Sequence, residues 1–174
     1  MRRIRYKVVA SLDGFIAGLN GEADWITTDP DVDFNAIFKQ FDTLLVGRRT
    51  FEGMAQAGRA TVPGMKTILF SRTLKQSNYP GVRVISDNWP EVLTDLRTTP
   101  GKDIWLFGGG SLFKSLLERG FVDTVEVAIM PILLGRGISL LPPPADRAIL
   151  RLTHQNVYKT GIVLVEYAVA KAAA

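Results

Sequence analysis

The 174-residue sequence contains no cysteine and only one histidine, His154. The lack of cysteine excludes disulfide bonds, a thiolate nucleophile and any zinc or iron–sulfur site that needs cysteine ligands. A single histidine also argues against a metal site built from histidines. His154 lies within a strand-like stretch near the C-terminus, and we interpret it as a surface or interface residue rather than a catalytic one. These absences argue against metal-based and cysteine-based chemistry.

The sequence also has no apolar run long enough to cross a membrane. The N-terminal stretch MRRIRYKVVASLDGF superficially resembles a signal peptide, because basic residues precede apolar ones. Lys7 and Asp13 interrupt the apolar stretch too early for the hydrophobic segment of such a peptide. We therefore expect a cytoplasmic protein.

Charge of neither sign dominates, since the net charge is +4 and charged residues make up 22% of the chain. The basic residues are scattered, and their densest groups are Arg2-Arg3-Ile4-Arg5 and Arg48-Arg49. This pattern suits a small anionic ligand better than nucleic acid. The length and the 47% hydrophobic fraction fit one globular domain, which we expect over residues 1–170, followed by a tail over residues 171–174.

Short apolar runs typical of β-strands recur along the whole chain. Several are continuous Val, Ile and Leu rather than alternating, as is typical of strands buried on both faces of a parallel sheet. The last two runs flank Lys159-Thr160-Gly161, which predicts an antiparallel hairpin at the end of the sheet. The eight runs are Ile4–Ala10, Thr43–Val46, Thr67–Phe70, Val82–Ile85, Ile104–Phe107, Val125–Met130, Leu150–Val157 and Ile162–Val169.

Helical patterns lie between these runs. The apolar residues from Phe34 to Phe41 follow the spacing of one helix face, and we predict that Asp29 caps this helix with Pro30 at its first position. The alternation of strands and helices predicts a mainly parallel α/β sheet. Two further helices are predicted, one beginning at Asn88 or Trp89 and one over Ser111–Arg119, with Gly120 ending it.

The strongest local signal for a ligand site is DIWLFGGGSLFKSLLERG, in which a buried strand leads through Gly108-Gly109-Gly110 into the helix beginning at Ser111. Amide groups at a helix start are unpaired and the helix dipole favours an anion there. Glycines let a pyrophosphate approach the backbone closely. The same glycines can instead serve only as a tight turn, because the pattern is not the GxGxxG fingerprint of a Rossmann dinucleotide site.

Three other segments offer groups that suit a dinucleotide. Arg48, Arg49 and Thr50 follow a strand that ends at Gly47, and arginine forks match phosphate oxygens. Ser71-Arg72 follows another strand, where a hydroxyl beside a guanidinium suits the 2′-phosphate of NADPH. The apolar residues after the Asp13-Gly14 turn can cover a ring as a flap, or form an ordinary hairpin corner.

In this order and spacing, SLDGFIA, GRRTFE, LFSRTL, FGGGSLF and VDTVEVAIMPILLGRG resemble the dihydrofolate-reductase-like family. The first and last motifs are most similar to the branch that contains the C-terminal reductase domain of the bifunctional riboflavin-biosynthesis enzyme and its stand-alone relatives. The resemblance extends from residue 4 to about residue 168. It implies a three-layer α/β fold with a mostly parallel central sheet of about eight strands, an antiparallel C-terminal hairpin, helices on both faces, and a homodimer.

The resemblance further implies an NADPH-dependent reductase that transfers a hydride to a heterocyclic or phosphoribosylamino-pyrimidine-type substrate. Four groups of residues would then bind NADPH. Val9, Ala10, Ile16, Ala17 and Gly18 would surround the nicotinamide, and Gly47, Arg48, Arg49 and Thr50 would hold phosphates, with Ser71 and Arg72 at the 2′-phosphate. The pyrophosphate and the nicotinamide ribose would contact Phe107, Gly108, Gly109, Gly110, Ser111, Leu112 and Phe113.

The substrate half departs from dihydrofolate reductases, because Asp24 stands before Trp25 where those enzymes have Pro-Trp. Asp31 or Asp33 is the candidate proton donor, although an acidic residue in a first helical turn is also favoured by the helix dipole alone. Trp25, together with Phe34 and Arg136, is the candidate substrate contact, and a plain turn is the alternative for Arg136.

The sequence also bears on two other activities. The zinc deaminase that accompanies the riboflavin reductase needs a cysteine-containing signature, so this chain lacks that activity. A dihydrofolate or other pterin reductase is disfavoured by the missing Pro-Trp. A dimer that binds NADP without turnover stays open.

Overall fold

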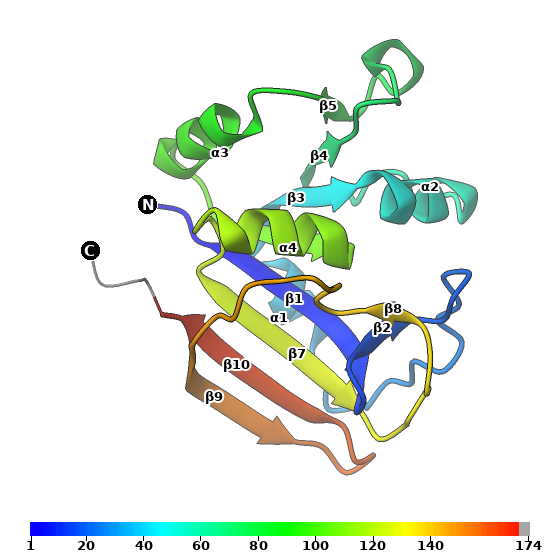
Figure 1. The fold of residues 1–174 in the computed structure, drawn as a ribbon. Coiled ribbons are helices and arrows are strands. Elements are labelled where there is room, and N and C mark those ends of the chain that lie inside the picture. Colours follow the sequence, from blue (N-terminus) through cyan, green and yellow to red (C-terminus); the bar gives the residue numbers. More distant parts are fainter. Residues whose placement is uncertain (171–174) are drawn as a thin grey trace.

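The structure, a computed structural model, describes residues 1–170 and is built around an eight-stranded sheet (Figure 1). The tail expected over residues 171–174 lies outside the described residues. The strands of the sheet are β1 (Ile4–Ser11), β3 (Phe41–Gly47), β4 (Lys66–Phe70), β5 (Arg83–Ile85), β6 (Asp103–Gly108), β7 (Thr124–Met130), β9 (Leu150–Val157) and β10 (Val163–Val169).

The strand order is β5-β4-β3-β6-β1-β7-β10-β9. Every pairing from β5 to β7 is parallel, whereas β10 is antiparallel to both β7 and β9. The predicted sheet, mostly parallel and ending in an antiparallel hairpin, is thus confirmed.

Helices cover both faces of this sheet, which confirms the predicted three-layer arrangement. In Figure 1, α4 lies in front of the sheet and α1 lies behind it. No helix in the described part of the chain is long and apolar enough to cross a bilayer. The helices are α1 (Phe34–Phe38), α2 (Arg48–Gln56), α3 (Trp89–Thr98) and α4 (Gly110–Glu118), and a short 3₁₀ helix spans Gln76–Asn78.

The core has two sides because successive residues of β1 point to opposite faces of the sheet. Tyr6 points toward α4, where its ring stacks on Phe113 with 3.9 Å between centroids. On the opposite face Trp105 packs on Phe41, with 5.2 Å between their rings, and its indole Nε1 donates to the carbonyl of Lys7 at 2.9 Å. Trp105 is therefore a core residue.

The prediction for the first helix was wrong at both ends. Its cap is Asp33, whose Oδ1 accepts from the amide of Ala36 at 2.9 Å, and not Asp29. The carboxylate of Asp29 instead accepts hydrogen bonds from the amide of Asp31 and from the amide and hydroxyl of Thr160, in the turn between β9 and β10. The helix ends at Phe38, and Phe41 begins β3, where its ring is 2% exposed. Burial of this ring in the sheet core stabilises the strand at that position.

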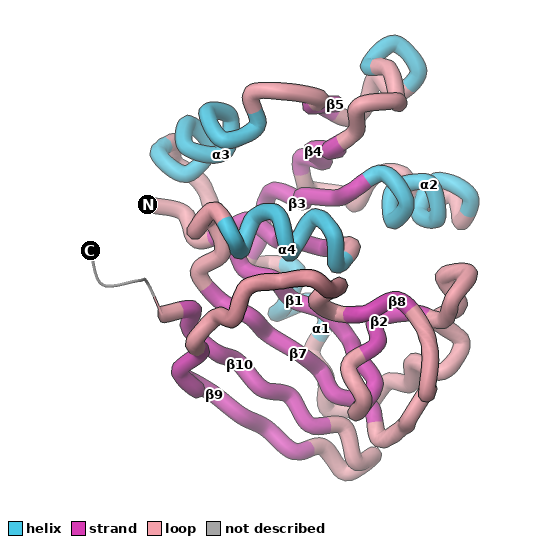
Figure 2. The backbone as a smooth tube through the Cα atoms, in the orientation of Figure 1, coloured by secondary structure: helices cyan, strands magenta, loops and turns pink. Residues whose placement is uncertain are grey.

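The sequence did not predict a second, two-stranded sheet at the carboxyl end of β1, drawn in Figure 2 beside the long strands. It consists of β2 (Phe15–Ala17) and β8 (Ile138–Ser139), which pair antiparallel. The two strands approach so closely that a side chain at Gly137 would collide with the carbonyl oxygen of Ala17. Strands of two or three residues carry no periodicity that a sequence pattern can reveal.

Candidate active site

The carboxyl ends of β3 and β6 lie next to each other, and each leads directly into a helix. A Cβ atom placed on Gly47 would lie 3.6 Å from the carbonyl oxygen of Gly108 and 3.7 Å from the amide nitrogen of Gly109. The GRRT and GGGS segments, 61 residues apart, therefore lie side by side. Parallel α/β sheets bind their ligands at this edge.

Neither of these helices has a side-chain cap. The N-cap residues are Gly47 for α2 and Gly109 for α4, and no side chain among residues 1–170 accepts a hydrogen bond from the amides of either first turn. A Cβ at Gly109 would lie 3.2 Å from the Thr50 hydroxyl, so the two turns approach each other closely. Two helix starts with free amide donors thus open at one place, an arrangement that suits a diphosphate.

Basic side chains surround these helix starts. Arg48 is exposed and pairs with Glu52 one turn along α2, at 3.1 Å. Arg49 and Arg72 are also exposed, and neither forms an ion pair within the described residues. Guanidinium groups without an internal carboxylate partner remain available to a phosphate ligand.

A cleft of about 810 Å³ lies between α3 and α4 and is lined by both Ser71 and Arg72. The Ser71 hydroxyl oxygen is fixed, because it accepts from the amides of Thr73 at 3.3 Å and Leu74 at 3.0 Å. Leu112 lines this cleft as well, and its Cβ would be 3.6 Å from a Cβ on Gly47. Leu112 of the first turn of α4 thus contacts both the cleft and the start of α2.

The residues expected around the nicotinamide lie at the same edge. Val9 and Ala10 are near the end of β1, and Ile16 and Ala17 belong to β2. The partner strand of β2 also reaches α4, since a Cβ on Gly110 would be 2.5 Å from the carbonyl oxygen of Ser139. Gly18 follows β2, and its amide donates to the carbonyl of Glu22 at 2.9 Å.

The residues expected to contact the substrate lie farther apart from one another than the residues expected to bind the cofactor. Asp33 is engaged as the cap of α1, while the exposed Asp31 carboxylate accepts no hydrogen bond within the described residues. Trp25 is half-buried and its Nε1 donates to a backbone carbonyl, and Phe34 remains 48% exposed. Arg136 is exposed on the loop after β7, and no hydrogen bond or ion pair within residues 1–170 joins it to either carboxylate.

A family model described as the RibD C-terminal domain matches residues 2–164 of this chain, which includes every segment of the site. The chain belongs to the RibD C-terminal domain family. This confirms the resemblance found in the sequence motifs.

Similar proteins and solved structures define the fold of this RibD-family chain more closely. It is 35% identical to the uncharacterized protein YyaP of Bacillus subtilis, over 95% of this chain and 94% of YyaP. A putative riboflavin biosynthesis protein from Shewanella sp. PV-4 shares its fold with a TM-score of 0.81 and 23% identity, over 98% and 100% of the two chains. Dihydrofolate reductase from Enterococcus faecalis, solved with NADP(H), gives 0.70 and 18%, over 97% of each chain. The dihydrofolate-reductase-like fold is thereby established.

One residue that the sequence marked only as a turn, Asp13, has a larger role in this RibD-family chain. Its carboxylate accepts from the Ser11 hydroxyl at 2.6 Å and from the backbone amides of Leu134 at 3.1 Å and Gly135 at 2.7 Å. These bonds, led by that of Ser11, lower the pKa of Asp13. The Asp-Gly pair revealed the turn, but nothing local revealed partners more than 120 residues away.

A buried ion network on β1 and β7 was also missed. Glu126 is 1% exposed and receives hydrogen bonds from Arg5 at 2.5 and 2.8 Å, from Lys7 at 3.1 Å and from Thr124 at 2.9 Å. Burial alone would raise the pKa of Glu126, but the Arg5 and Lys7 charges and these hydrogen bonds outweigh it, so the pKa is lowered. The network keeps Glu126 ionised and anchors two basic side chains on the face that α1 covers.

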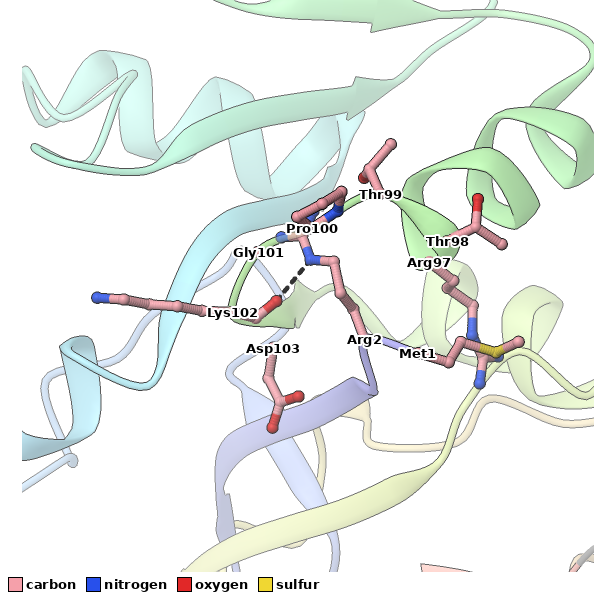
Figure 3. Close-up of a pocket in the computed structure, with 9 residues that line it drawn as sticks. All are labelled: Met1, Arg2, Arg97, Thr98, Thr99, Pro100, Gly101, Lys102 and Asp103. Carbon is pink, nitrogen blue, oxygen red and sulfur yellow. Dashed lines mark hydrogen bonds between the residues drawn. The ribbon is translucent and has the colours of Figure 1, made fainter.

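A second cavity, of about 310 Å³, lies at the amino end of β6 (Figure 3). It is lined by the chain start and by residues 97–103, and the Arg2 guanidinium crosses it to donate to the carbonyl of Lys102 at 2.5 Å. Asp103, in its wall, is the first residue of β6, whereas Gly108, the last, belongs to the candidate site. This cavity therefore has no part in the site.

Proposed function

We propose that this RibD-family chain is an NADPH-dependent reductase that acts on a phosphoribosylamino-pyrimidine-type or related heterocyclic substrate. The observation that carries the proposal is the meeting of two uncapped helix starts, at Gly47 and Gly109, beside a cleft that Arg72 lines. That arrangement provides amide donors for a diphosphate and a guanidinium for a further phosphate. The NADP(H) bound by the Enterococcus faecalis enzyme of the same fold supports this assignment.

In this proposal the chain holds the cofactor along the carboxyl edge of the sheet. The amides that follow Gly47 and Gly109 bind the diphosphate, with Arg48 and Arg49 nearby, and Ser71 and Arg72 bind the 2′-phosphate. When bound, NADPH supplies the hydride. The remaining contacts to the diphosphate and nicotinamide ribose come from Phe107, Gly108, Gly110, Ser111, Leu112 and Phe113, and those to the nicotinamide from Val9, Ala10, Ile16, Ala17 and Gly18.

The substrate would lie beside the nicotinamide, between β2 and the segment that carries Trp25 and Phe34. Its reduction also needs a proton, which we assign to the carboxyl group of Asp31 or Asp33. The bond from Ala36 occupies only Oδ1 of Asp33, and Oδ2 is left for a second partner. Arg136 would contact an anionic group of the substrate.

The experiment is an NADPH titration followed by tryptophan fluorescence, then a substrate panel in which NADPH oxidation is followed by absorbance. We expect binding of NADPH in preference to NADH, and turnover with a phosphoribosylamino-pyrimidine. Turnover with dihydrofolate alone would instead make the chain a pterin reductase. NADPH binding without turnover on any pyrimidine or pterin would leave a dinucleotide-binding protein that is not an enzyme. No NADPH binding would refute the proposal.

We also propose that the chain forms a homodimer through its C-terminal hairpin. Val165 and Tyr167 of β10 pair with Val127 and Val125 of β7, so they share the face that α4 covers farther along the sheet. No helix covers that face over β9 and β10 in Figure 1. Leu152 and Val157 of β9 are 47% and 70% exposed, and a second copy would remove this apolar surface from water.

A further inference from the structure

The turn after β1 and the loop after β7 are joined by one carboxylate. Asp13 belongs to the SLDG turn, and its carboxylate accepts hydrogen bonds from the adjacent backbone amides of Leu134 and Gly135. The Ser11 hydroxyl donates a third hydrogen bond to the same carboxylate. The three donors together form a small anion site that the chain fills with its own side chain. Charge-assisted bonds of this kind are stronger than neutral ones and fix geometry well.

The loop that Asp13 holds is the one that carries Arg136. Two further contacts fix its ends: the amide of Leu12 donates to the carbonyl of Ile132 at 2.9 Å, and Gly137 lies directly against the carbonyl of Ala17 in β2. The loop, the SLDG turn and β2 are therefore joined by direct contacts. Arg136 itself has no ion pair within the described residues, so its orientation depends on the backbone that carries it.

We infer that Asp13 is a positioning residue of the reductase, which holds the 132–137 loop so that Arg136 faces the substrate beside β2. The inference rests on the proposed function, because it assigns Arg136 to an anionic group of the substrate. Asp13 acts at a distance from that group, through two backbone amides. The residues proposed for the 2′-phosphate line the cleft between α3 and α4, away from this loop. Loss of Asp13 should therefore weaken substrate binding more than NADPH binding.

The test uses Asp13→Asn, Arg136→Ala and the double variant in the full chain, with Asp146→Asn as the control. Asp146 is likewise an exposed aspartate, and its side chain makes no hydrogen bond within residues 1–170. An asparagine at position 13 keeps the size but turns an N–H₂ donor toward groups that need an acceptor. Hydrogen exchange at the amides of Leu134 and Gly135 reports the loop directly, without any need for catalysis.

We expect Asp13→Asn and Arg136→Ala each to raise the KM for the phosphoribosylamino-pyrimidine about 10–100-fold, with a clearly smaller change in the Kd of NADPH. The double variant should have the same KM as Arg136→Ala, because both substitutions remove the same interaction between Arg136 and the substrate. In Asp13→Asn the two amides should exchange faster than in the wild type and in Asp146→Asn.

Three results would overturn the inference. One is faster amide exchange with an unchanged KM, which would make Asp13 purely structural. The second is a KM of the double variant that is raised by the product of the two single effects, because Asp13 and Arg136 would then act independently. The third is equal loss of NADPH and substrate binding. A wild-type chain that binds no NADPH and turns over no substrate refutes the proposed function itself, whereas these three results refute only the role of Asp13.

Discussion

Asp29 and Thr160, 131 residues apart in the chain, are joined by two hydrogen bonds to the same carboxylate oxygen. Oδ2 of Asp29 accepts from the Thr160 amide at 3.1 Å and from its hydroxyl at 2.8 Å, while Oδ1 accepts from the amide of Asp31 at 2.9 Å. The side chain of Asp29 thus ties the segment that carries the candidate proton donors to the turn of the C-terminal hairpin.

This tie predicts a defined dependence of stability on pH. The hydrogen bond from Asp31, followed by those from Thr160, lowers the pKa of Asp29 in the folded chain. A group with a lowered folded pKa stabilises the fold above its unfolded pKa, about 3.9 for aspartate, and this stabilisation is lost as the pH falls through the folded pKa. Asp29→Asn should therefore lower the melting temperature at pH 7, and the difference from wild type should shrink below about pH 4. A difference that stays constant down to pH 2 would contradict this assignment.

The choice between NADPH and NADH should depend on Arg72. Arg72→Ala removes the guanidinium from the cleft wall, and we expect NADPH binding to weaken by about 1.5–3 kcal/mol, the size of a hydrogen bond to a charged group. Binding of NADH, which lacks the 2′-phosphate, should barely change. The measurement is fluorescence titration with both cofactors, with the exposed Arg147→Ala as the control. Equal losses for both cofactors would show that Arg72 does not recognise the 2′-phosphate.

Turnover should depend on one of the two carboxylates near α1. Asp31→Asn and Asp33→Asn are made separately, since asparagine at position 33 can still cap the helix. Loss of the proton donor should lower kcat about 10²–10⁴-fold at an unchanged Kd for NADPH. The other variant should lose at most about 0.3–1 kcal/mol of stability, the value of a helix-start charge. If both keep wild-type kcat on a confirmed substrate, the proton comes from another group or from water.

Two glycines within helices should respond in opposite ways to alanine. In α2 a Cβ on Gly53 would meet nothing within 4 Å, so Gly53→Ala should stabilise the chain by about 0.5–1 kcal/mol through helix propensity. In α4 a Cβ on Gly110 would lie 2.5 Å from the carbonyl oxygen of Ser139 and 3.0 Å from that of Leu140, so Gly110→Ala should cost about 1–3 kcal/mol. Urea unfolding of the two variants measures the change in the free energy of unfolding, which should have opposite signs. A neutral Gly110→Ala would mean that Ser139 and Leu140 do not pack directly against α4.

The last prediction concerns the proposed homodimer. Light scattering should give about twice the 19.2 kDa chain mass at micromolar concentration. Val165→Glu places a charge on the apolar face of the hairpin and should give a monomer, whereas a change at His154, which pairs with Glu166 on the opposite face, should leave the mass unchanged. A wild-type mass of a single chain would refute the dimer.

The sequence by itself determined the elements whose signal is local. The continuous run Ile104–Phe107 predicts a buried strand without knowledge of its neighbours, and the structure has β6 over Asp103–Gly108. The glycines that follow it mark the start of α4 because few other residues allow backbones to approach so closely there. The order of such motifs was also sufficient to indicate the family.

Only the tertiary structure decided which distant groups the polar side chains bind. Asp13, Asp29 and Asp33 all stand in sequence contexts typical of turns and helix starts, yet only Asp33 caps a helix. A carboxylate gains similar energy from a neighbouring amide and from one 120 residues away, so the local sequence does not distinguish the two. The distinction arises when the sheet brings β1 beside β7 and the hairpin turn of β9 and β10 beside the segment before α1.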